Sequence, residues 1–518
     1  MSIGRPVTIG AILRDLASEQ PERVAIRDPS NAYTYRQLSE LSLAAAHNLV
    51  DAGLRPGQVV AWLSPSSADF IVMYFATALA GLRILPLNPR LALPELDSVI
   101  ALTAPAMIVG SELSADLVDG LVARHGITRR YAIDRVPLPA GWQRLMELYR
   151  SPASGAAVAP TLPGTAHELL LTSGTTGHVK VVERTQGVRL AESLMAMTHT
   201  AMTTSTHQLR LSPQFHMGGI IGPYQTILAG GTATIGTFAP DIACHGIRDG
   251  ATFIAAVPAQ YTLLIQAPEF AGVDASAVAF CSFGGSPSNQ SDLRRIQEAF
   301  ANAQLLQIYG STEAGLVATS HGADFRDHLT SVGLPFPGVD VLIADDEGQP
   351  VAPGEIGELL VRSPYTMSGY YGRPDLTDQA FREGFLRMGD LARQDDDGRL
   401  YLAGRGSDMI ITGGENVHPQ EVEDVLLRHP SIDTAVVFSR QDDVFQERVA
   451  AVVTIRPNGP SLMLDDLGRD LVGQARASLA NFKVPREIYR MSAIPRNASG
   501  KVDRRALADL VEAMERIY

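Results

Sequence analysis

Cysteine is nearly absent from this sequence, with only Cys244 and Cys281 among 518 residues. So few thiols exclude a disulfide scaffold and a cysteine-rich zinc site, and they suit a reducing compartment. Long hydrophobic runs are missing as well, because the most apolar early stretch, residues 70–82, is shorter than the ~20 residues that span a bilayer. The first residues lack the apolar region of a secretory signal. We therefore interpret the apolar stretch at residues 70–82 as a buried helix and expect a cytoplasmic protein without a transmembrane segment.

Basic residues are in the minority: 43 Lys and Arg stand against 56 Asp and Glu, which gives a net charge of -13. A surface this acidic repels a phosphate backbone, so nucleic acid is not an expected partner. An anionic small molecule has to be held locally instead, by backbone N–H groups, a metal ion or a few cationic side chains. Short motifs therefore say more about function than the net charge does.

The sequence is rich in apolar residues (45%), glycine (46) and proline (32), as is typical of a globular α/β enzyme with many turns. Its length exceeds that of a single core, so we expect at least two domains. Strand-like runs alternate with helical stretches in the first half, as in parallel sheets built from βαβ units. After residue 404 the pattern becomes that of a small α+β unit. The expected fold is a large multi-sheet α/β domain over residues 1–403 and an α+β domain over 408–518, joined near Ser407.

A loop rich in glycine and hydroxyl groups follows a strand-like run at residues 168–171. Its sequence, T-S-G-T-T-G-H-V-K, allows close backbone approach and supplies hydroxyl donors and one cation, which together suit phosphate oxygens. The spacing differs from that of the Walker A motif, and an ordinary turn is the alternative interpretation. The candidate phosphate-binding residues are Thr172, Ser173, Gly174, Thr175, Thr176, Gly177 and Lys180.

The same loop resembles the phosphate-binding signature of the adenylate-forming (ANL) superfamily, and four more signatures of that family follow in order. They are Y-G-S-T-E at 309–313, M-G-D at 388–390, G-R leading to G-G-E-N-V at 404–417, and N-A-S-G-K at 497–501. Each is weak alone, but together they cover most of the chain beyond residue 165. The chain is thereby identified as similar to the acyl-CoA synthetases and aryl-CoA ligases of this superfamily.

This resemblance implies a ligase that uses ATP, Mg²⁺ and coenzyme A to convert a carboxylic acid into a CoA thioester through an acyl adenylate (acyl-AMP). Because no cationic pair in the sequence marks a dicarboxylate site, we expect an apolar acid: aryl, polycyclic or aliphatic. Two alternatives are a stand-alone adenylation enzyme that loads a carrier protein and a non-catalytic binder of acyl adenylates. The run G-G-E-N-V-H-P favours CoA over a carrier protein, and the presence of Lys501, Glu313 and Asp390 argues against the binder.

By resemblance, residues 309–313 hold the nucleotide: Tyr309 stacks on adenine, Thr312 contacts the α-phosphate and Glu313 binds Mg²⁺. Hard oxygen ligands suit that ion, which keeps water and substrate phosphates as its other ligands. A strand end with a capping threonine is the structural alternative. Gly310 and Ser311 complete this segment, and Gly310 is also expected beside the acyl group. A second loop resembles the segment next to adenine and the acyl group, and its residues are Gly284, Gly285, Ser286 and Pro287.

Asp390 and Lys501 extend the predicted site. The Asp390 carboxylate only accepts hydrogen bonds, as is needed to hold two ribose hydroxyls, and Arg405 is its expected companion near ribose and phosphate. The resemblance places Lys501 between the carboxylate and the α-phosphate during adenylation, where a cation orients two anions and offsets charge in the transition state. Without the resemblance, Asp390 would be a local turn cap and Lys501 a solvated surface charge.

His216, in the segment S-P-Q-F-H-M-G-G, resembles the aromatic gate of many acyl-CoA synthetases. A structural histidine is the alternative, and metal ligation is disfavoured because no second ligand stands at a suitable spacing. The nearby Gly218, Gly219 and Gly222 would leave room for a bulky acyl group. The expected catalytic residues are His216, Thr172, Glu313 and Lys501.

The resemblance also implies that the small domain is mobile and rotates between the half-reactions. One pose inserts Lys501, and the other presents Gly413 and Gly414 to the pantetheine arm of CoA. Members of the family commonly carry Asp or Lys at the hinge, whereas this chain has Ser407. A homodimer is a further association that the sequence leaves open.

The phosphate loop departs from the family pattern on both sides of Lys180. The usual continuation is Pro-Lys-Gly, but this chain has Val179 and Val181. Proline fixes φ and glycine permits conformations closed to a β-branched residue, so the loop is expected to fold differently over the β- and γ-phosphates. We therefore hypothesise that adenylation is slow or lost while thioesterification persists, with a partner enzyme supplying the adenylate. The alternative is a loop that tolerates valine.

Overall fold

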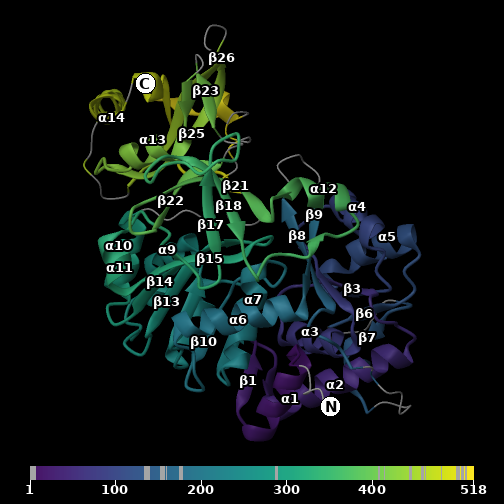
Figure 1. Cartoon of the computed structure of the whole chain (residues 1–518). Helices are drawn as coiled ribbons and strands as arrows, with labels where there is room; N and C mark the ends of the chain where they lie inside the picture. Colours follow the sequence, from purple (N-terminus) through teal and green to yellow (C-terminus); the bar gives the residue numbers. More distant parts are fainter. Residues whose placement is uncertain are drawn as a thin grey trace.

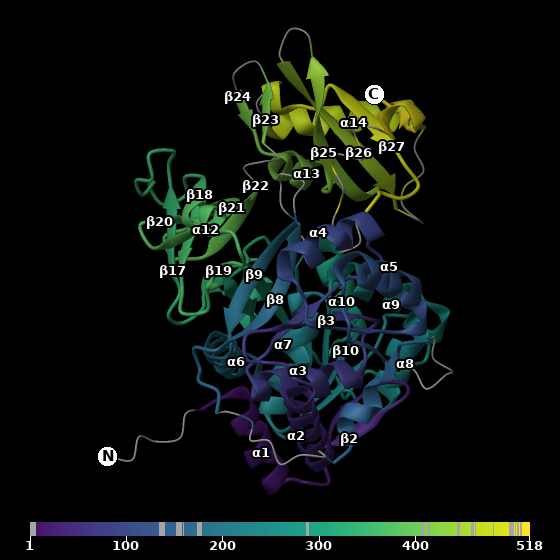
Figure 2. The same ribbon diagram turned by 90° about the vertical axis from the view of Figure 1, so that its right-hand side faces the viewer.

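Figures 1 and 2 show the computed structural model of the chain, in which four β-sheets and their covering helices form the molecule. The structure describes residues 7–133, 140–151, 158, 160–173, 179–285, 290–405, 409–412, 415–442, 446–456, 460, 463–479, 481–496, 502, 504, 507 and 510–518.

The first large sheet has eight strands, and its middle strands run parallel. Strand β3 reads Val-Val-Ala-Trp-Leu and is buried throughout, as expected for a parallel strand covered on both faces. Helix α3, the predicted buried helix, begins after the Ser67 side chain caps its first turn and ends at Gly81. In sheet order the strands are β19 (Gly369–Tyr370), β9 (Val179–Thr185), β8 (Ala166–Ser173), β4 (Arg83–Pro86), β3 (Val59–Leu63), β5 (Met107–Gly110), β6 (Arg130–Ala132) and β7 (Gln143–Arg144).

The second large sheet has nine strands, and its parallel centre carries strands that end in the predicted ligand-binding loops. In sheet order they are β16 (Leu334–Pro335), β15 (Gly315–His321), β14 (Gln304–Ser311), β13 (Phe280–Gly284), β12 (Phe253–Ala256), β10 (His207–Arg210), β11 (Thr232–Ile235), β1 (Val24–Arg27) and β2 (Ala32–Thr34). The helices of the large part are α1 (Ile9–Glu19), α2 (Tyr35–Asp51), α3 (Ala68–Ala80), α4 (Leu93–Thr103), α5 (Ala115–His125), α6 (Gln186–Thr200), α7 (Met217–Leu228), α8 (Pro240–Arg248), α9 (Pro258–Gln266), α10 (Gln290–Ala299), α11 (Gly322–Asp327) and α12 (Pro374–Ala380).

One hydrophobic core joins the two large sheets through α3 and α7. The ring centroids of Tyr74 and Phe75 on α3 lie 5.7 Å and 6.0 Å from that of Tyr224 on α7. Among the described residues, no helix is long and apolar enough to cross a membrane. The two sheets therefore share one interior and form one unit.

Two smaller sheets complete the fold. An antiparallel sheet of five strands contains β17 (Asp340–Ala344), β18 (Gly357–Arg362), β20 (Phe381–Arg382), β21 (Phe385–Gln394) and β22 (Leu400–Arg405). A six-stranded sheet contains β23 (Ile410–Thr412), β24 (Glu415–Val417), β25 (Ile432–Asp442), β26 (Gln446–Ile455), β27 (Glu487–Arg490) and β28 (Glu515–Arg516), packed with α13 (Pro419–Leu426) and α14 (Leu464–Ser478).

The C-terminal body has its own cores, whose members all lie at or beyond Ile410. Both views place α13 and α14 at the end of the molecule opposite α1 and α2 (Figures 1 and 2). This confirms the predicted fold class, a large multi-sheet α/β part with a small α+β part. The chain leaves the five-stranded sheet at Arg405 and enters the six-stranded sheet at Ile410. The boundaries at 403 and 408 and the hinge stay predictions, because Ser407 lies outside the described residues.

Candidate active site

Strands β13 and β14 place two predicted loops at the same edge of the nine-stranded sheet. The strands are parallel neighbours, with Gly284 opposite Ile308, so their carboxyl ends meet as in other ligand-binding α/β sheets. Gly285 follows β13 with a φ of +78°. Strand β14 then turns back into β15, where Gly310 and Ser311 pair with residues 316 and 315. The segment predicted to hold the nucleotide is therefore a tight turn at this edge.

The residues predicted for adenine and ribose lie in direct contact. The Tyr309 hydroxyl donates a hydrogen bond to the Asp390 carboxylate at 2.5 Å. Asp390 lies on β21 of the five-stranded sheet, directly opposite Arg405 on β22. These residues, which are far apart in the sequence, are brought together as the nucleotide role requires. The role itself stays a prediction.

Tyr370 connects two further predicted residues, Glu313 and Lys180. Its hydroxyl donates to the Glu313 carboxylate at 3.2 Å, and the Lys180 ammonium lies 4.9 Å from the centroid of its ring. Burial, together with the Glu313 charge, raises the pKa of Tyr370 well above its usual range, so the phenol stays a neutral donor. Sequence reasoning missed Tyr370, because it enters the site only through the pairing of β19 with β9.

Glu313 is the residue that would hold Mg²⁺. Among the described residues there is no group of three or more His, Cys, Asp or Glu side chains that could bind a metal. A single carboxylate still fits this ion, which takes its remaining ligands from water and substrate phosphates. Tyr370 fixes the orientation of the Glu313 carboxylate, which is the usual function of a partner behind a metal ligand.

The phosphate loop connects two strands of one hairpin. Thr172 pairs with Lys180 and Ser173 with Val179 across β8 and β9. The Thr172 hydroxyl is buried and has no hydrogen-bond partner among the described atoms, which costs about 1 to 3 kcal/mol unless a ligand satisfies it. A phosphate oxygen would do so. The remaining loop residues Gly174, Thr175, Thr176 and Gly177 lie outside the described residues.

Val179 and Val181, the departures from the family pattern, belong to the regular ladder of β9. Val181 is 1% exposed and packs into the core that contains Leu169. A β-branched residue is well suited to such a strand. The two valines therefore extend the strand, which favours the alternative of a tolerant loop.

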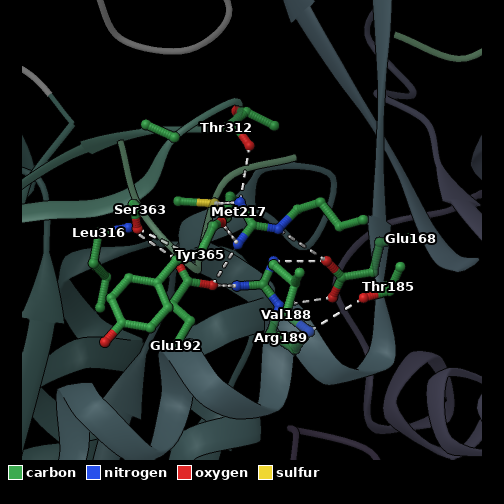
Figure 3. A network of polar contacts seen from close by, with 12 residues as sticks. Glu168, Thr185, Val188, Arg189, Glu192, Met217, Thr312, Leu316, Ser363 and Tyr365 are labelled. Carbon is green, nitrogen blue, oxygen red and sulfur yellow. Dashed lines mark hydrogen bonds and ion pairs between the residues drawn. The ribbon is translucent and has the colours of Figure 1, made fainter. Parts of the chain in front are cut away.

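Behind the site lies a buried network of four charged side chains. Glu168, Arg189 and Glu192 are labelled in Figure 3, and the fourth member is Arg184. All four are completely buried. Arg189 donates to both oxygens of Glu168, at 2.8 and 2.7 Å, and also to Glu192. Burial alone would raise the pKa of Glu168, but Arg189 holds it at about 2. Glu168 is therefore ionised, and the four side chains are paired within the network.

The network holds the turn that carries Thr312 and Glu313. Arg184 donates to the Thr312 carbonyl at 3.0 Å, and Glu192 accepts from the Leu316 N–H at 2.9 Å (Figure 3). Gly315, between them, has a φ of +75°, and an added Cβ would lie 2.6 Å from the Glu192 carboxylate. Any larger residue would push the turn away from its support. Sequence analysis missed this network, because its members lie on three consecutive elements, β8, β9 and α6, and only the packing of these elements brings the side chains together.

His216 lies immediately before α7, and its N–H donates to the Pro213 carbonyl at 3.1 Å. The next residue, Met217, has its sulfur 3.9 Å from the Arg184 guanidinium, which also binds the Thr312 carbonyl. The predicted gate residue, His216, thus immediately precedes a helix whose first residue contacts the arginine that holds the nucleotide turn. Gly218 is the second residue of that helix.

The other predicted residues lie outside the described part of the chain or lack a described side chain, and their roles stay predictions. They are Ser286, Pro287, Gly413, Gly414 and Lys501, together with the side chain of Arg405. The flanking backbone is described: Thr412 pairs with Glu415, and Arg496 forms a bridge with Val502.

Comparison with known proteins gives a consistent result. The family model of the AMP-binding enzymes matches residues 13–371, and that of the AMP-binding enzyme C-terminal domain matches 421–501. A feruloyl-CoA synthase of Amycolatopsis sp. is 31% identical over 94% of this chain and 95% of its own length. The long-chain-fatty-acid–CoA ligase FadD13 of Mycobacterium tuberculosis is 30% identical over 98% and 99%.

A solved structure, the amide bond synthetase McbA from Marinactinospora thermotolerans, superimposes with a TM-score of 0.86 at 27% identity, over 97% of this chain and 99% of the other. These matches span nearly the whole chain, and the sequence signatures cover most of the part beyond residue 165. The chain therefore belongs to the AMP-binding enzyme family, in the acyl- and aryl-CoA synthetase branch of the adenylate-forming superfamily, and is an AMP-forming acid–thiol ligase.

Proposed function

We propose that this chain converts an aryl, polycyclic or aliphatic carboxylic acid into its CoA thioester through an enzyme-bound acyl adenylate. The observation that carries the proposal is the convergence at the end of β14. There Tyr309 binds Asp390, and Tyr370 joins Glu313 to Lys180. A carboxylate proposed to accept hydrogen bonds from ribose, a carboxylate proposed to bind the metal and a cation proposed to bind phosphate thus lie around one turn.

In the first half-reaction, a carboxylate oxygen of the acid attacks the α-phosphorus of ATP, and the bond to pyrophosphate breaks. Asp390 and Tyr309 are proposed to hold the nucleoside. Glu313 would hold Mg²⁺, which would supply positive charge to neutralise the phosphates. Lys501 is expected to bring the two anions together. In the second half-reaction, the CoA sulfur attacks the acyl carbon and AMP leaves.

The acid is proposed to lie against α7 and the neighbouring strand ends. Met217 and Ile308 are half-buried apolar residues in this region, so they favour an acid with an apolar body. Two of the relatives are named for feruloyl-CoA and for long-chain fatty acids joined to CoA. A third relative, 31% identical, is named as a fatty acid–acyl-carrier-protein ligase, so the proposal of CoA as the acceptor is supported by the run G-G-E-N-V-H-P and not by the names of the relatives.

Whether this chain adenylates its own acid is a separate question. The position of Val179 and Val181 in a regular ladder supports full activity, against the hypothesis of impaired adenylation. Acid-dependent exchange between ATP and pyrophosphate distinguishes them. Robust exchange by the native enzyme would reject the impaired-adenylation hypothesis. Absent exchange that a Val179→Pro, Val181→Gly double variant restores would support it and would imply a partner that supplies the adenylate.

The proposed function is tested with a panel of acids, ATP and either CoA or a pantetheinylated carrier protein, with products identified by mass spectrometry. We expect CoA thioesters from one class of acid. Thioester on the carrier protein alone would favour the stand-alone adenylation enzyme. Tight binding of a synthetic acyl adenylate without turnover in either half-reaction would favour the non-catalytic binder.

A further inference from the structure

Strand β10 presents two polar side chains to α7. Residues alternate between the two faces of a strand, and Leu209 and Leu211 pack into the core on one face. Gln208 and Arg210 point the other way, where an added Cβ on Gly218 would lie 2.5 Å from an Arg210 Nη atom. An added Cβ on Gly222 would lie 2.9 Å from the Gln208 Oε1 atom. The bare glycines of α7 therefore make room for these two side chains.

Arg210 is a partly buried cation that has no counter-ion among the described residues. Its Nε atom is inaccessible and unpaired, and the guanidinium forms no hydrogen bond or ion pair with any described residue. Burial lowers the pKa of Arg210 to about 10, so the group is still charged at neutral pH. By contrast, the two fully buried arginines that the structure describes, Arg184 and Arg189, are paired with carboxylates.

The start of α7 adds positive potential at the same place. This helix has no acidic residue in its first turn and no side-chain cap. The Gly219 N–H already donates to the His216 carbonyl at 2.9 Å, but the positive end of the helix dipole can still attract an anion. The Arg210 guanidinium lies against Gly218, in that first turn. Two positive features therefore converge with no described negative group to balance them.

Gln208 supplies a polar group beside the cation. Its Oε1 atom is buried and has no hydrogen-bond partner among the described atoms. A ligand with a hydroxyl or a protonated carboxyl oxygen could donate to it, and the amide nitrogen of the same side chain can donate to a carboxylate.

We propose that Arg210, assisted by Gln208 and the first turn of α7, binds a second carboxylate carried by the acid substrate. This inference rests on the proposed function, since it places the acyl group beside His216 and Gly284. Only β12 separates β10 from β13, so the two strand axes are about 10 Å apart. A compact dicarboxylic acid, with an aromatic ring or a short chain between its ends, spans that distance. The substrate proposed here thus has the apolar body expected from the sequence and, in addition, a second carboxylate at its far end.

The first experiment measures binding by calorimetry, without ATP, for two matched pairs: terephthalate with 4-methylbenzoate, and adipate with hexanoate. We expect the native enzyme to bind the dicarboxylate of at least one pair about 10- to 100-fold more tightly, as for a charge-assisted hydrogen bond. Arg210→Leu should remove that ratio. Arg124→Leu, at an exposed arginine on α5, should keep it.

Equal affinity for both members of each pair in the native enzyme would overturn the proposal. So would Arg210→Leu weakening both members equally, because Arg210 would then hold the reacting carboxylate or only support the fold. If Arg210→Leu does not fold, Arg210→Lys and Gln208→Leu replace it. The lysine variant should keep a reduced preference for the dicarboxylate. If both variants keep the full preference of the native enzyme, the site is also rejected.

The second experiment measures thioester formation from the same acids. Preferential binding of a dicarboxylate without any thioester would support the Arg210 site and count against the proposed function. Thioester from the monocarboxylates, with equal binding of both members of each pair, would support the proposed function and overturn the Arg210 site.

Discussion

At the scale of single residues, the contact between Tyr309 and Asp390 has the most direct functional consequence. Asp390→Ala should weaken AMP binding by about 10- to 100-fold, because a hydrogen bond to a charged acceptor contributes about 1.5 to 3 kcal/mol. Calorimetric titration with AMP measures this. Asp340→Ala, an exposed position in the same sheet, is the matched control, and unchanged AMP affinity in Asp390→Ala would remove that residue from the site.

Tyr370 offers a test of the metal carboxylate. Tyr370→Phe removes the hydrogen bond to Glu313 but keeps the ring beneath Lys180. The Mg²⁺ concentration for half-maximal ATP–pyrophosphate exchange should rise about 10-fold, as when a partner behind a metal ligand is lost. Tyr371→Phe is the control, since Tyr371 instead contacts Arg83. An unaltered Mg²⁺ dependence would separate Glu313 from the metal.

The lowered pKa values of His167 and Glu168 predict that the free energy of unfolding falls as the pH is lowered. Burial lowers the pKa of His167 to about 4, and Arg189, acting against burial, lowers that of Glu168 to about 2. Both values lie below the ordinary ones, so the unfolded chain binds protons more readily as the pH falls. His167 contributes stability above about pH 6.5 that is lost toward pH 4, and Glu168 contributes stability above about pH 4.5 that is lost toward pH 2.

Urea unfolding across this pH range should show a loss on the order of 1 to 3 kcal/mol for each group. A His167→Gln variant should not lose stability between pH 6.5 and 4, but it should still lose the stability that Glu168 contributes as the pH falls further. A stability that stays constant down to pH 4 in the native chain would contradict the assignment to His167.

At the scale of elements, the four-charge network joins β8, β9 and α6 to the nucleotide turn. Arg189→Met leaves Glu168 and Glu192 short of partners in a fully buried site. Removing one member of a buried ion pair costs about 3 to 5 kcal/mol, so the free energy of unfolding in urea should fall by about that amount. Arg362→Met, at an exposed pair, should change it little. A small change in Arg189→Met would mean that the network adapts.

The sequence predicted the strand before the phosphate loop, the buried helix near residue 70 and the ligand-binding ends of β13 and β14, because each depends on a local apolar run followed by turn residues. It missed that Val179 and Val181 continue a strand. It also missed Tyr370, Arg210 and the charge network. These depend on pairing between distant segments, such as β9 with β19, on the packing of neighbouring elements, or on the face to which a strand residue points. A single sequence carries no direct signal for any of these.

At the scale of the whole molecule, a partly exposed ion pair joins the small C-terminal part to the large part in the described portion of the chain. Arg295 on α10 pairs with Asp433 on β25 at 3.1 Å, with both side chains about one-third exposed. Such partly solvated pairs contribute about 0 to 1 kcal/mol. An interaction of that size is compatible with the rotation predicted for the small part.

Lys501→Ala tests that rotation. Adenylation, measured by ATP–pyrophosphate exchange, should fall by about 100- to 1,000-fold, as when a placed transition-state contact is lost. Thioester formation from a synthetic acyl adenylate should be largely retained, because the predicted second pose uses the face of Gly413 and Gly414. Lys483→Ala, at a lysine paired with Glu421, is the control. Equal losses in both half-reactions would contradict alternation of the domains.

The separate hydrophobic cores of the two parts also determine where this chain could be joined to the chain of a relative in a chimeric protein, at a junction called a crossover. The core that α3 and α7 share ties the two large sheets together, so a crossover placed between them would cut through one interior. A crossover between Arg405 and Ile410 cuts through none, because the cores of the C-terminal part begin at Ile410. We therefore expect the C-terminal part to behave as an interchangeable module: grafted onto a relative, it would carry its CoA-facing chemistry along, while the choice of acid would stay with the recipient.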